Sequence, residues 1–344
     1  MIFAFSLFVL LVMTKTKVIL CKSTYNENYL DKIYTTQING FFVFIIMLNH
    51  FASSVTSIYA FDRLYLMVQH LNQCVVVSFL FYSGFGIFEQ YKMGGGGYLN
   101  KLLTRKIPYC LFIFDCFTII HISISLITRQ NMDFNVCKIL LLFMGYDNIG
   151  NLNWYIFYIL LNYFFAFCIF SLNIKAFIKI FLIFILNTIY VLCLWKLKNE
   201  EYWFYATSFL FPLGMLFNLN KDKIDTFVNK HYCFFLILSF LLYFVSAIVV
   251  KILIKDLGLV FNLISVFFMA MVLLLSKKII LNSKILNFLG RNVFIIYNIQ
   301  MIPIYFLKCI DFEIDRSNYL FLLPMYILYI VGTTFLINLL KKES

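Results

Sequence analysis

Three ionisable side chains lie inside long apolar stretches of this chain: His50, Asp115 and His121. An ionisable group at membrane depth costs free energy, so each of them is a candidate functional residue. An imidazole surrounded by apolar helices resists protonation, stays neutral near pH 7 and can accept a proton from an alcohol. His50 is therefore a candidate general base. For Asp115 and His121, a hydrogen bond to a neighbouring helix is the simpler interpretation.

Polar residues accompany His50 along one face of its expected helix. Asn39 precedes His50 by eleven residues, which brings it almost onto the same face and about 16 Å closer to one membrane surface. Ser53, Ser54 and Ser57 continue this stripe beyond His50. A polar stripe along a span is typical of a water-filled or ligand-filled groove.

Small residues and then a basic segment follow in the next expected helix. Ser83, Gly84 and Gly86 would let another backbone approach closely, and tight helix packing alone would explain them. Four basic residues flank the glycines at 94–97: Lys92, Lys101, Arg105 and Lys106. Basic side chains beside a flexible glycine-rich turn can hold the phosphates of a nucleotide-like donor. The usual excess of Lys and Arg in cytoplasmic connections predicts similar residues without a ligand.

The composition shows what kind of scaffold must position these residues. Of the 344 residues, 63% are hydrophobic and only 13% are charged, against roughly 25% charged in soluble domains. These few charged side chains cannot cover the surface of a soluble protein of this size. Lipid must therefore surround most of the chain. The apolar runs are continuous, which disfavours the alternating pattern of a membrane β-barrel.

The remaining composition excludes other classes of protein. The net charge of +12 is explained by Lys and Arg in cytoplasmic connections, so no nucleic-acid partner is expected. The nine cysteines are scattered singly, which predicts neither a disulfide framework nor a metal site. Common hydrolase, metalloprotease and nucleotide-binding motifs are not found in the sequence.

The elements expected from the hydropathy are membrane-spanning helices. A span needs roughly 20 apolar residues, and ten such runs follow residue 37. We place them at about 38–59, 71–88, 107–128, 152–173, 176–195, 203–219, 232–250, 258–276, 292–309 and 318–340. Most of the 28 Lys and Arg residues then lie on the side of residues 21–37. Both ends of this all-α bundle of about ten helices are therefore expected to be cytoplasmic.

We expect a single transmembrane domain over residues 35–340. It is preceded by an apolar segment and a cytoplasmic lead-in at residues 1–34 and followed by a cytoplasmic tail at 341–344. The apolar stretch from Ile2 to Met13 is an eleventh span, an interfacial helix or the result of a misassigned start. The stretch 137–147 is too short to span and predicts an interfacial or re-entrant helix.

Taken in order, these pieces resemble the membrane acyltransferase family known as acyltransferase 3. The resemblance spans about residues 35–340 and rests on five segments: Asn39–His50, Phe79–Gly86, Tyr98–Pro108, Asn153–Tyr158 with Trp154 near its head, and Leu289–Gln300 with Tyr297 near its end. Each segment is apolar and degenerate.

The resemblance implies that an acyl group passes from cytoplasmic acyl-CoA to a hydroxyl of a sugar or lipid-linked glycan. The acyl group expected is acetyl. It implies that His50 is the catalytic base or a transient acyl carrier, and that the CoA phosphates bind at Lys101, Arg105 and Lys106. The supporting residues that it implies are Asn39, Ser83, Gly84, Asp115, Trp154 and Tyr297. No metal is implied.

Two positions depart from the family pattern. The residue eleven before the histidine is commonly Arg in the family and is Asn39 here, so either the basic segment supplies the phosphate contact or the donor is held differently. Gln300 stands where many members have a second histidine, which disfavours a two-histidine mechanism.

Two other classes of function remain open. The chain is alternatively a multi-span glycan or lipid transporter, with His50 lining a translocation path, or a polysaccharide-assembly subunit in which His50 joins helices. The abundance of Lys, Asn, Ile and Phe is typical of an AT-rich bacterial genome, so we expect a bacterial inner-membrane protein in contact with lipid. The identity of the acceptor and the oligomeric state are left open.

Overall fold

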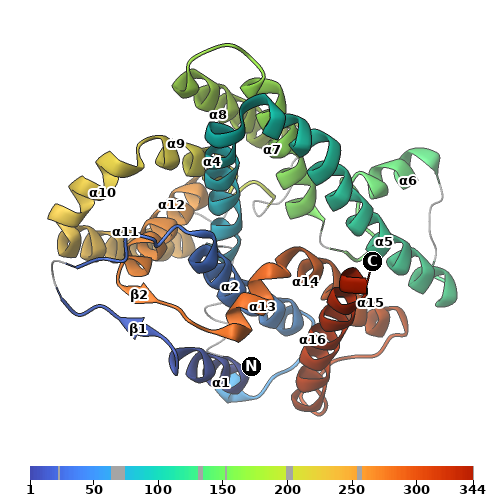
Figure 1. The fold of residues 1–344 in the computed structure, drawn as a ribbon. Helices are drawn as coiled ribbons and strands as arrows, with labels where there is room; N and C mark the ends of the chain where they lie inside the picture. The colour runs from blue at the N-terminus through green and yellow to red at the C-terminus, as the bar shows by residue number, and fades with distance from the viewer. Residues whose placement is uncertain are drawn as a thin grey trace.

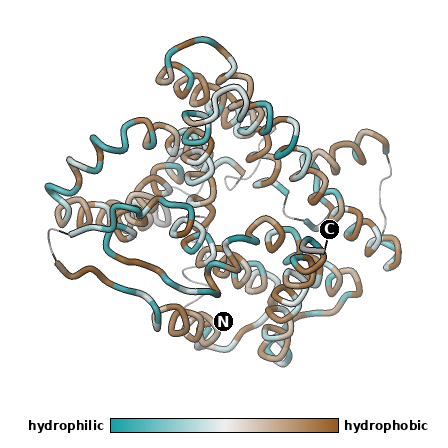
Figure 2. Tube along the Cα trace, viewed as in Figure 1, coloured by the Kyte–Doolittle hydropathy of each residue, from teal (hydrophilic) through white to brown (hydrophobic). Residues whose placement is uncertain are grey.

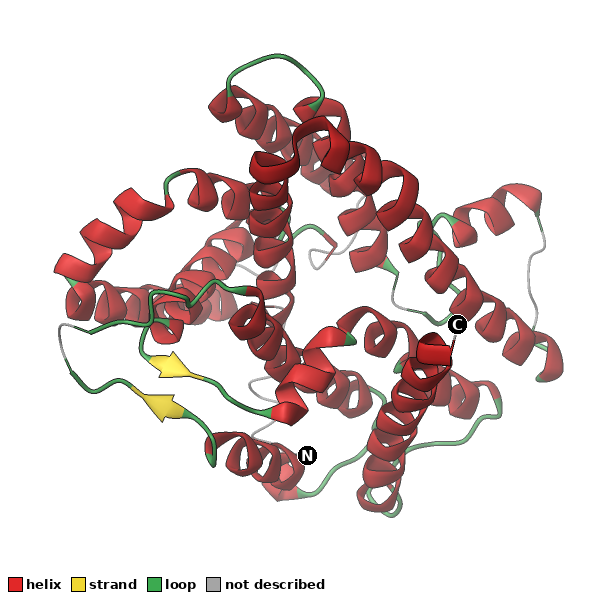
Figure 3. Cartoon of the chain, in the orientation of Figure 1, coloured by secondary structure: helices red, strands yellow, loops and turns green. Residues whose placement is uncertain are grey.

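Helices carry nearly all of the regular structure. The computed structural model describes residues 1–21, 24–62, 74–130, 135–151, 153–198, 204–253 and 258–343. Within these ranges the sheet is limited to two antiparallel two-residue strands, β1 (Lys17–Val18) and β2 (Ile279–Ile280) (Figure 3). The prediction of an all-α protein is therefore confirmed.

The helices are distributed along the whole chain (Figure 1). In order they are α1 (Ile2–Met13), α2 (Lys32–Ser53), η1 (Ala60–Asp62), α4 (Val77–Lys101), η3 (Leu102–Lys106), α5 (Ile107–Ile127), α6 (Val136–Phe143), α7 (Trp154–Phe170), α8 (Ala176–Leu192), η4 (Cys193–Lys198), α9 (Leu210–Leu219), α10 (Lys221–Lys230), α11 (Tyr232–Leu253), α12 (Gly258–Ser276), α13 (Lys284–Arg291), α14 (Val293–Ile299), α15 (Met301–Cys309) and α16 (Tyr319–Glu343). α6 overlaps the segment expected to form a short helix at 137–147 and ends at Phe143.

Several of these helices can cross a membrane. Among the described residues, four helical stretches are long and apolar enough: Cys74–Ile127, Ala176–Lys196, Tyr232–Val249 and Tyr319–Lys341. α13 together with α14 and α15 makes a fifth if the 70° bend between them lies within one span. Figure 2 shows hydrophobic residues along most helices, whereas α10 is largely hydrophilic. The length and apolar composition of these helices indicate a multi-pass membrane protein. The count of ten spans stays a prediction.

The glycine-rich segment between the second and third expected spans is helical except at Gly95, so the turn expected there is a kink between two helical parts and not a loop. α4 runs through all four glycines, and the helical geometry is broken only at Gly95, with φ of 49°. Glycine is the residue that tolerates a positive φ, so a single Gly can bend a helix without ending it. Figure 1 shows the chain turning from α4 into α5 across this segment.

The first of the ten expected spans ends earlier than predicted. α2 stops at Ser53, so His50 lies in the last helical turn and not midway along a span. Ser53 and Ser54 donate hydrogen bonds to carbonyls of their own helix, and the amide of Thr56 donates to Ile314 O at 2.8 Å. Hydroxyl side chains that bond to nearby backbone compete with helix continuation. The serines are therefore part of the helix end, and the predicted polar stripe does not extend along α2 beyond it.

α13 lies directly on the first half of α2. A Cβ atom at Gly40 would be 2.0 Å from Leu286 O, and a Cβ atom at Gly290 would be 1.8 Å from Thr36 O. The two backbones can be this close only because both positions are glycine. α1 packs farther along α2, where the rings of Phe8 and Phe44 stack at 3.8 Å.

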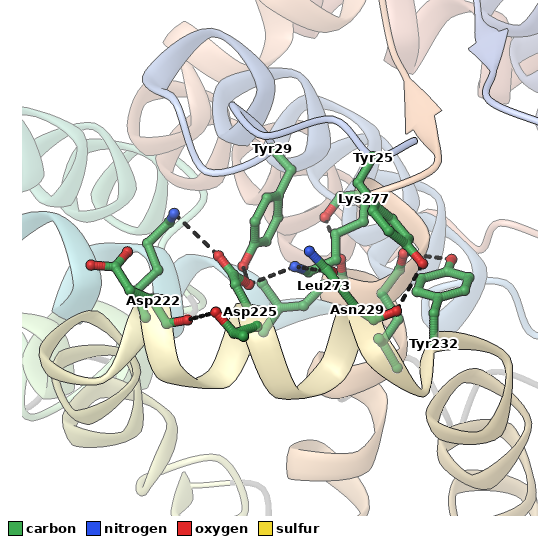
Figure 4. Close-up of polar contacts among 12 residues, drawn as sticks. Tyr25, Tyr29, Asp222, Asp225, Asn229, Tyr232, Leu273 and Lys277 are labelled. Carbon is green, nitrogen blue, oxygen red and sulfur yellow. Dashed lines mark hydrogen bonds and ion pairs between the residues drawn. The ribbon is translucent and has the colours of Figure 1, made fainter. Parts of the chain in front are cut away.

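A charged cluster ties the lead-in segment to α10 and to the end of α12 (Figure 4). Asp225 of α10 accepts hydrogen bonds from Lys277 at 2.5 Å and from the Tyr29 hydroxyl at 2.7 Å. Lys221 pairs with the other carboxylate oxygen at 3.2 Å. Burial alone would raise the pKa of the Asp225 carboxyl, but the bonds from Lys277 and Tyr29 outweigh it and hold that pKa below its ordinary value.

We expect Asp225→Asn to lower the free energy of unfolding by roughly 3 kcal/mol, because it leaves the buried Lys277 ammonium without its counter-charge. A carboxyl with a lowered pKa in the folded state stabilises the fold above its unfolded pKa of about 3.9 and loses this contribution as pH falls through the folded value. Melting of the detergent-purified protein at pH 7 and at successively lower pH tests both points. Asp222→Asn, an exposed position one turn earlier in α10, is the matched control. Equal melting curves for the two variants would contradict the prediction.

Candidate functional site

The basic residues predicted to hold phosphates line one cavity. Lys101, Arg105 and Lys106 lie around a space of about 870 Å³, together with Gly94 and Tyr98. They come from the last residue of α4 and from η3, a widened helical turn that leads into α5. Widened turns of this kind recur at functional sites. We call this space the first basic cavity.

The charge in the first basic cavity is of one sign. Among the described residues that line it, none is Asp or Glu. Glu89 is the nearest acidic residue in the sequence and is paired with Lys92 at 2.7 Å, and neither of them lines the cavity. Three cationic side chains without a counter-charge in the lining favour an anionic ligand such as a phosphate.

Lys106 connects this cavity to Ser83. The Lys106 ammonium lies 4.3 Å from the centroid of the Tyr163 ring. The Tyr163 hydroxyl lies 2.9 Å from Oγ of Ser83, close enough for a hydrogen bond. A cation over an aromatic face gains about 0.5–2 kcal/mol, so Tyr163 helps to fix the direction of the Lys106 side chain.

Sequence reasoning missed Tyr163. It is one of 23 tyrosines and lies in the largely apolar helix α7, directly after Asn162, where its spacing does not distinguish it from the other aromatic residues. Only its contacts with two residues from other helices reveal its position at the site.

Gly84 is a point of close backbone approach, as its small size predicts. A Cβ atom there would be 1.9 Å from the carbonyl oxygen of Phe211 in α9. In return, a Cβ atom at Gly214 of α9 would be 2.1 Å from Phe81 O. The same prediction is wrong for Gly86, where no atom lies within 4 Å of such a Cβ position. The difference arises because the two residues face different sides of α4.

Trp154 and Tyr297 both contact Tyr155. The ring centroid of Tyr155 lies 6.1 Å from that of Trp154 and 5.3 Å from that of Tyr297. Tyr155 and Tyr297 are almost fully buried. Aromatic contacts of this kind stabilise helix packing, so the cluster holds α14 against α7 beside the candidate site.

His50 is not among the described residues that line the first basic cavity. Its Nδ1 atom is buried and has no hydrogen-bond partner in the part of the chain that the structure describes. A ring nitrogen without a partner is available to a ligand, as donor or acceptor according to the tautomer. His50 lies ten residues, or about 15 Å, along α2 from Gly40, where α13 packs.

Asn39 and Asp115 are not brought to the first basic cavity either. Neither residue lines it, and the Oδ1 atom of each is buried without a hydrogen-bond partner among the described residues. The prediction that His121 bonds to a neighbouring helix is wrong. Its Nδ1 lies 2.9 Å from Phe117 O, which is one turn earlier in its own helix. A buried imidazole can satisfy one nitrogen locally in this way.

The described residues hold no group of three His, Cys, Asp or Glu side chains that could bind a metal ion. Comparison of the chain with protein-family models, with curated proteins and with solved structures finds no match. The site is therefore defined by its own geometry: a cavity with three cationic side chains, and the unpartnered Nδ1 of His50 on a separate helix.

Proposed function

We propose that this chain is a membrane acyltransferase that moves an acyl group, acetyl in the first instance, from acyl-CoA to a hydroxyl of a sugar or cell-surface glycan. The observation that carries the proposal is the first basic cavity, whose described lining has three cationic residues and no acidic one. Acyl-CoA carries a diphosphate and a separate 3′-phosphate, and Lys and Arg bind such groups through charge-assisted hydrogen bonds.

In the proposed reaction His50 acts as the general base. Its neutral imidazole takes the proton from the acceptor hydroxyl, while the hydroxyl oxygen attacks the thioester carbonyl carbon. The carbon–sulfur bond then breaks, the new ester is released, and the proton passes from His50 to the CoA thiolate. The unpartnered Nδ1 of His50 supports this role, because it is not engaged with the described part of the protein.

The proposal includes the membrane arrangement of about ten spans with both ends cytoplasmic, in a bacterial inner membrane. The first basic cavity fits this arrangement, because Lys101, Arg105 and Lys106 lie in a connection that the excess of Lys and Arg predicts to be cytoplasmic. Acyl-CoA is a cytoplasmic metabolite, so its phosphates would meet these residues on that side. The thioester would then reach into the bundle from there.

The two departures from the family pattern fit this arrangement. Asn39 is uncharged, so the first basic cavity carries the phosphate contacts. Gln300 is fully buried and its Nε2 donates to Tyr297 O at 3.2 Å. An amide cannot accept and release a proton near pH 7, so the proposed mechanism has a single histidine.

Transfer of label from radiolabelled acetyl-CoA in membranes containing the protein tests the proposal. We expect Lys101→Gln and Arg105→Gln each to raise the apparent KM for acetyl-CoA by roughly tenfold, because each removes a charge-assisted contact to phosphate. The kcat should change less, because neither residue contacts the reacting bond.

Lys92→Gln is the matched control for these variants. Lys92 has the same charge and lies in α4 with Lys101, but it does not line the first basic cavity. An unchanged KM in Lys92→Gln would show that the effect depends on the cavity. Correctly inserted wild-type protein without any label transfer would contradict the acyltransferase proposal and favour a transporter or an assembly subunit.

A further inference from the structure

A second cavity adjoins the first basic cavity. It has a volume of about 580 Å³ and is lined mainly by α13, α14 and α16. Its basic residues are Lys284, Arg291 and Lys341. Among the described residues of this lining, as in the first basic cavity, no acidic side chain occurs. We call this space the second basic cavity.

Tyr109 joins the two cavities. It lies in the first turn of α5 and lines both of them. The ammonium group of Lys341 donates a hydrogen bond of 2.6 Å to the Tyr109 hydroxyl. α5 contacts α14, and α14 contacts α16, so the helices that line the second basic cavity pack around the helix that carries Tyr109.

The second basic cavity also carries groups that suit a nucleobase. Three amide side chains line it, Asn287, Asn292 and Asn338, and three phenylalanine rings, Phe288, Phe294 and Phe335. Amide side chains can pair with the hydrogen-bonding edge of adenine, and aromatic rings stack on bases. The lining of the first basic cavity has fewer such groups: one amide, Gln90, and two tyrosine rings, Tyr98 and Tyr109, one of which it shares with the second basic cavity.

The convergence of charge is more than the usual excess of cytoplasmic Lys and Arg. That excess explains basic residues at the ends of individual spans. It does not explain why cationic residues from α4, η3, α13 and α16 surround two adjoining cavities with no acidic residue in the described lining. The six basic side chains are exposed, and a bound anion would lower the repulsion among them.

The geometry points to a single nucleotide ligand that occupies both cavities, with its 3′-phosphoadenosine part in the second basic cavity and its diphosphate in the first. This inference rests on the proposed function, since acyl-CoA carries phosphates at two separated positions of one molecule. Lys284, Arg291 and Lys341 would hold the 3′-phosphate, and Tyr109 would lie between the two phosphate sites.

Binding of adenosine 3′,5′-bisphosphate and of AMP to the detergent-purified full chain tests the second basic cavity without any acyl transfer. We expect the bisphosphate to bind roughly tenfold or more tightly than AMP, because it alone carries the 3′-phosphate. Lys284→Gln and Arg291→Gln should each remove most of this preference. Lys223→Gln, an exposed change in α10, should retain it.

A second measurement uses CoA and 3′-dephospho-CoA as competing ligands. Lys284→Gln and Arg291→Gln should weaken the binding of CoA by roughly tenfold and the binding of dephospho-CoA by less than about twofold. Lys101→Gln should weaken the binding of both ligands. Equal weakening of the two ligands by Lys284→Gln and Arg291→Gln, or no weakening, overturns the inference and leaves the acyltransferase proposal standing. Binding of the bisphosphate that depends on Lys284, without any acyl transfer, supports the cavity assignment and contradicts the proposed function.

Discussion

Replacing His50 with alanine is expected to reduce acetyl transfer from acetyl-CoA by about 10²- to 10⁴-fold, the usual contribution of a general base. The imidazole is the group proposed to take the proton from the acceptor hydroxyl, and its Nδ1 has no hydrogen-bond partner in the described structure. The effect should fall on kcat, since His50 does not line the first basic cavity where the CoA phosphates are proposed to bind. Label transfer in membranes that contain equal amounts of wild-type and variant protein gives the comparison.

His121→Ala is the matched control for this prediction. His121 is also a buried helical histidine with one ring nitrogen, Nε2, that has no partner among the described residues, but its Nδ1 is bonded to Phe117 O within its own helix. We expect this variant to lose some stability and to retain transfer per folded molecule. His50→Gln separates chemistry from packing, because glutamine is polar and of similar size but cannot act as a base. Full activity in His50→Gln would contradict the proposed role and make His50 a packing residue.

Replacing Gly84 with alanine is expected to destabilise the protein by about 3 kcal/mol or more, at the upper end of overpacking effects. The new methyl group would be 1.9 Å from the Phe211 carbonyl oxygen. This atom belongs to backbone and not to a flexible side chain, so α4 and α9 would have to move apart along the contact that also includes Gly214 and Phe81. Ser83, the next residue, would then lose its position against Tyr163.

Gly86→Ala in the same helix is the internal control. No atom lies within 4 Å of a Cβ at this position, and alanine has the higher helix propensity, so stability should be unchanged or rise by up to about 1 kcal/mol. Thermal melting of the two detergent-purified variants, followed by circular dichroism, gives the comparison, since the six exposed cysteines would react with a thiol dye before unfolding. Similar melting temperatures for the two variants would mean that α4 and α9 are not in close contact.

Several helices follow from the sequence almost to the residue. The predicted run at 258–276 coincides with α12 (Gly258–Ser276), and the run at 107–128 ends one residue after α5 (Ile107–Ile127). In these stretches the change from apolar to polar residues coincides with the end of the helix, because burying apolar side chains in lipid and satisfying the backbone internally favour the same boundaries.

Two local predictions failed: the turn at the glycines near residue 95 and the end of the first expected span. The four glycines near residue 95 predict a turn by propensity, yet α4 continues through them with one break at Gly95. The expected span at 38–59 includes residues 54–59, yet the chain leaves α2 after Ser53 and pairs with the segment at Ile314. No atom lies within 4 Å of a Cβ position at Gly95, Gly96 or Gly97, so no distant contact explains the helix there. After Ser53, by contrast, the hydrogen bond from the Thr56 amide to Ile314 O holds the chain away from α2.

Some residues of the candidate site follow from the sequence, and others are identified only by tertiary structure. The sequence by itself identified a helical membrane protein, His50 as a buried imidazole, and the basic residues Lys101, Arg105 and Lys106, because hydropathy and charge are properties of the residues themselves. Tertiary structure alone placed Tyr163 between Lys106 and Ser83, and brought Lys284, Arg291 and Lys341 to Tyr109. These groups come from helices that are far apart in the chain. Their proximity depends on side-chain packing between helices, and no local pattern of residues encodes it.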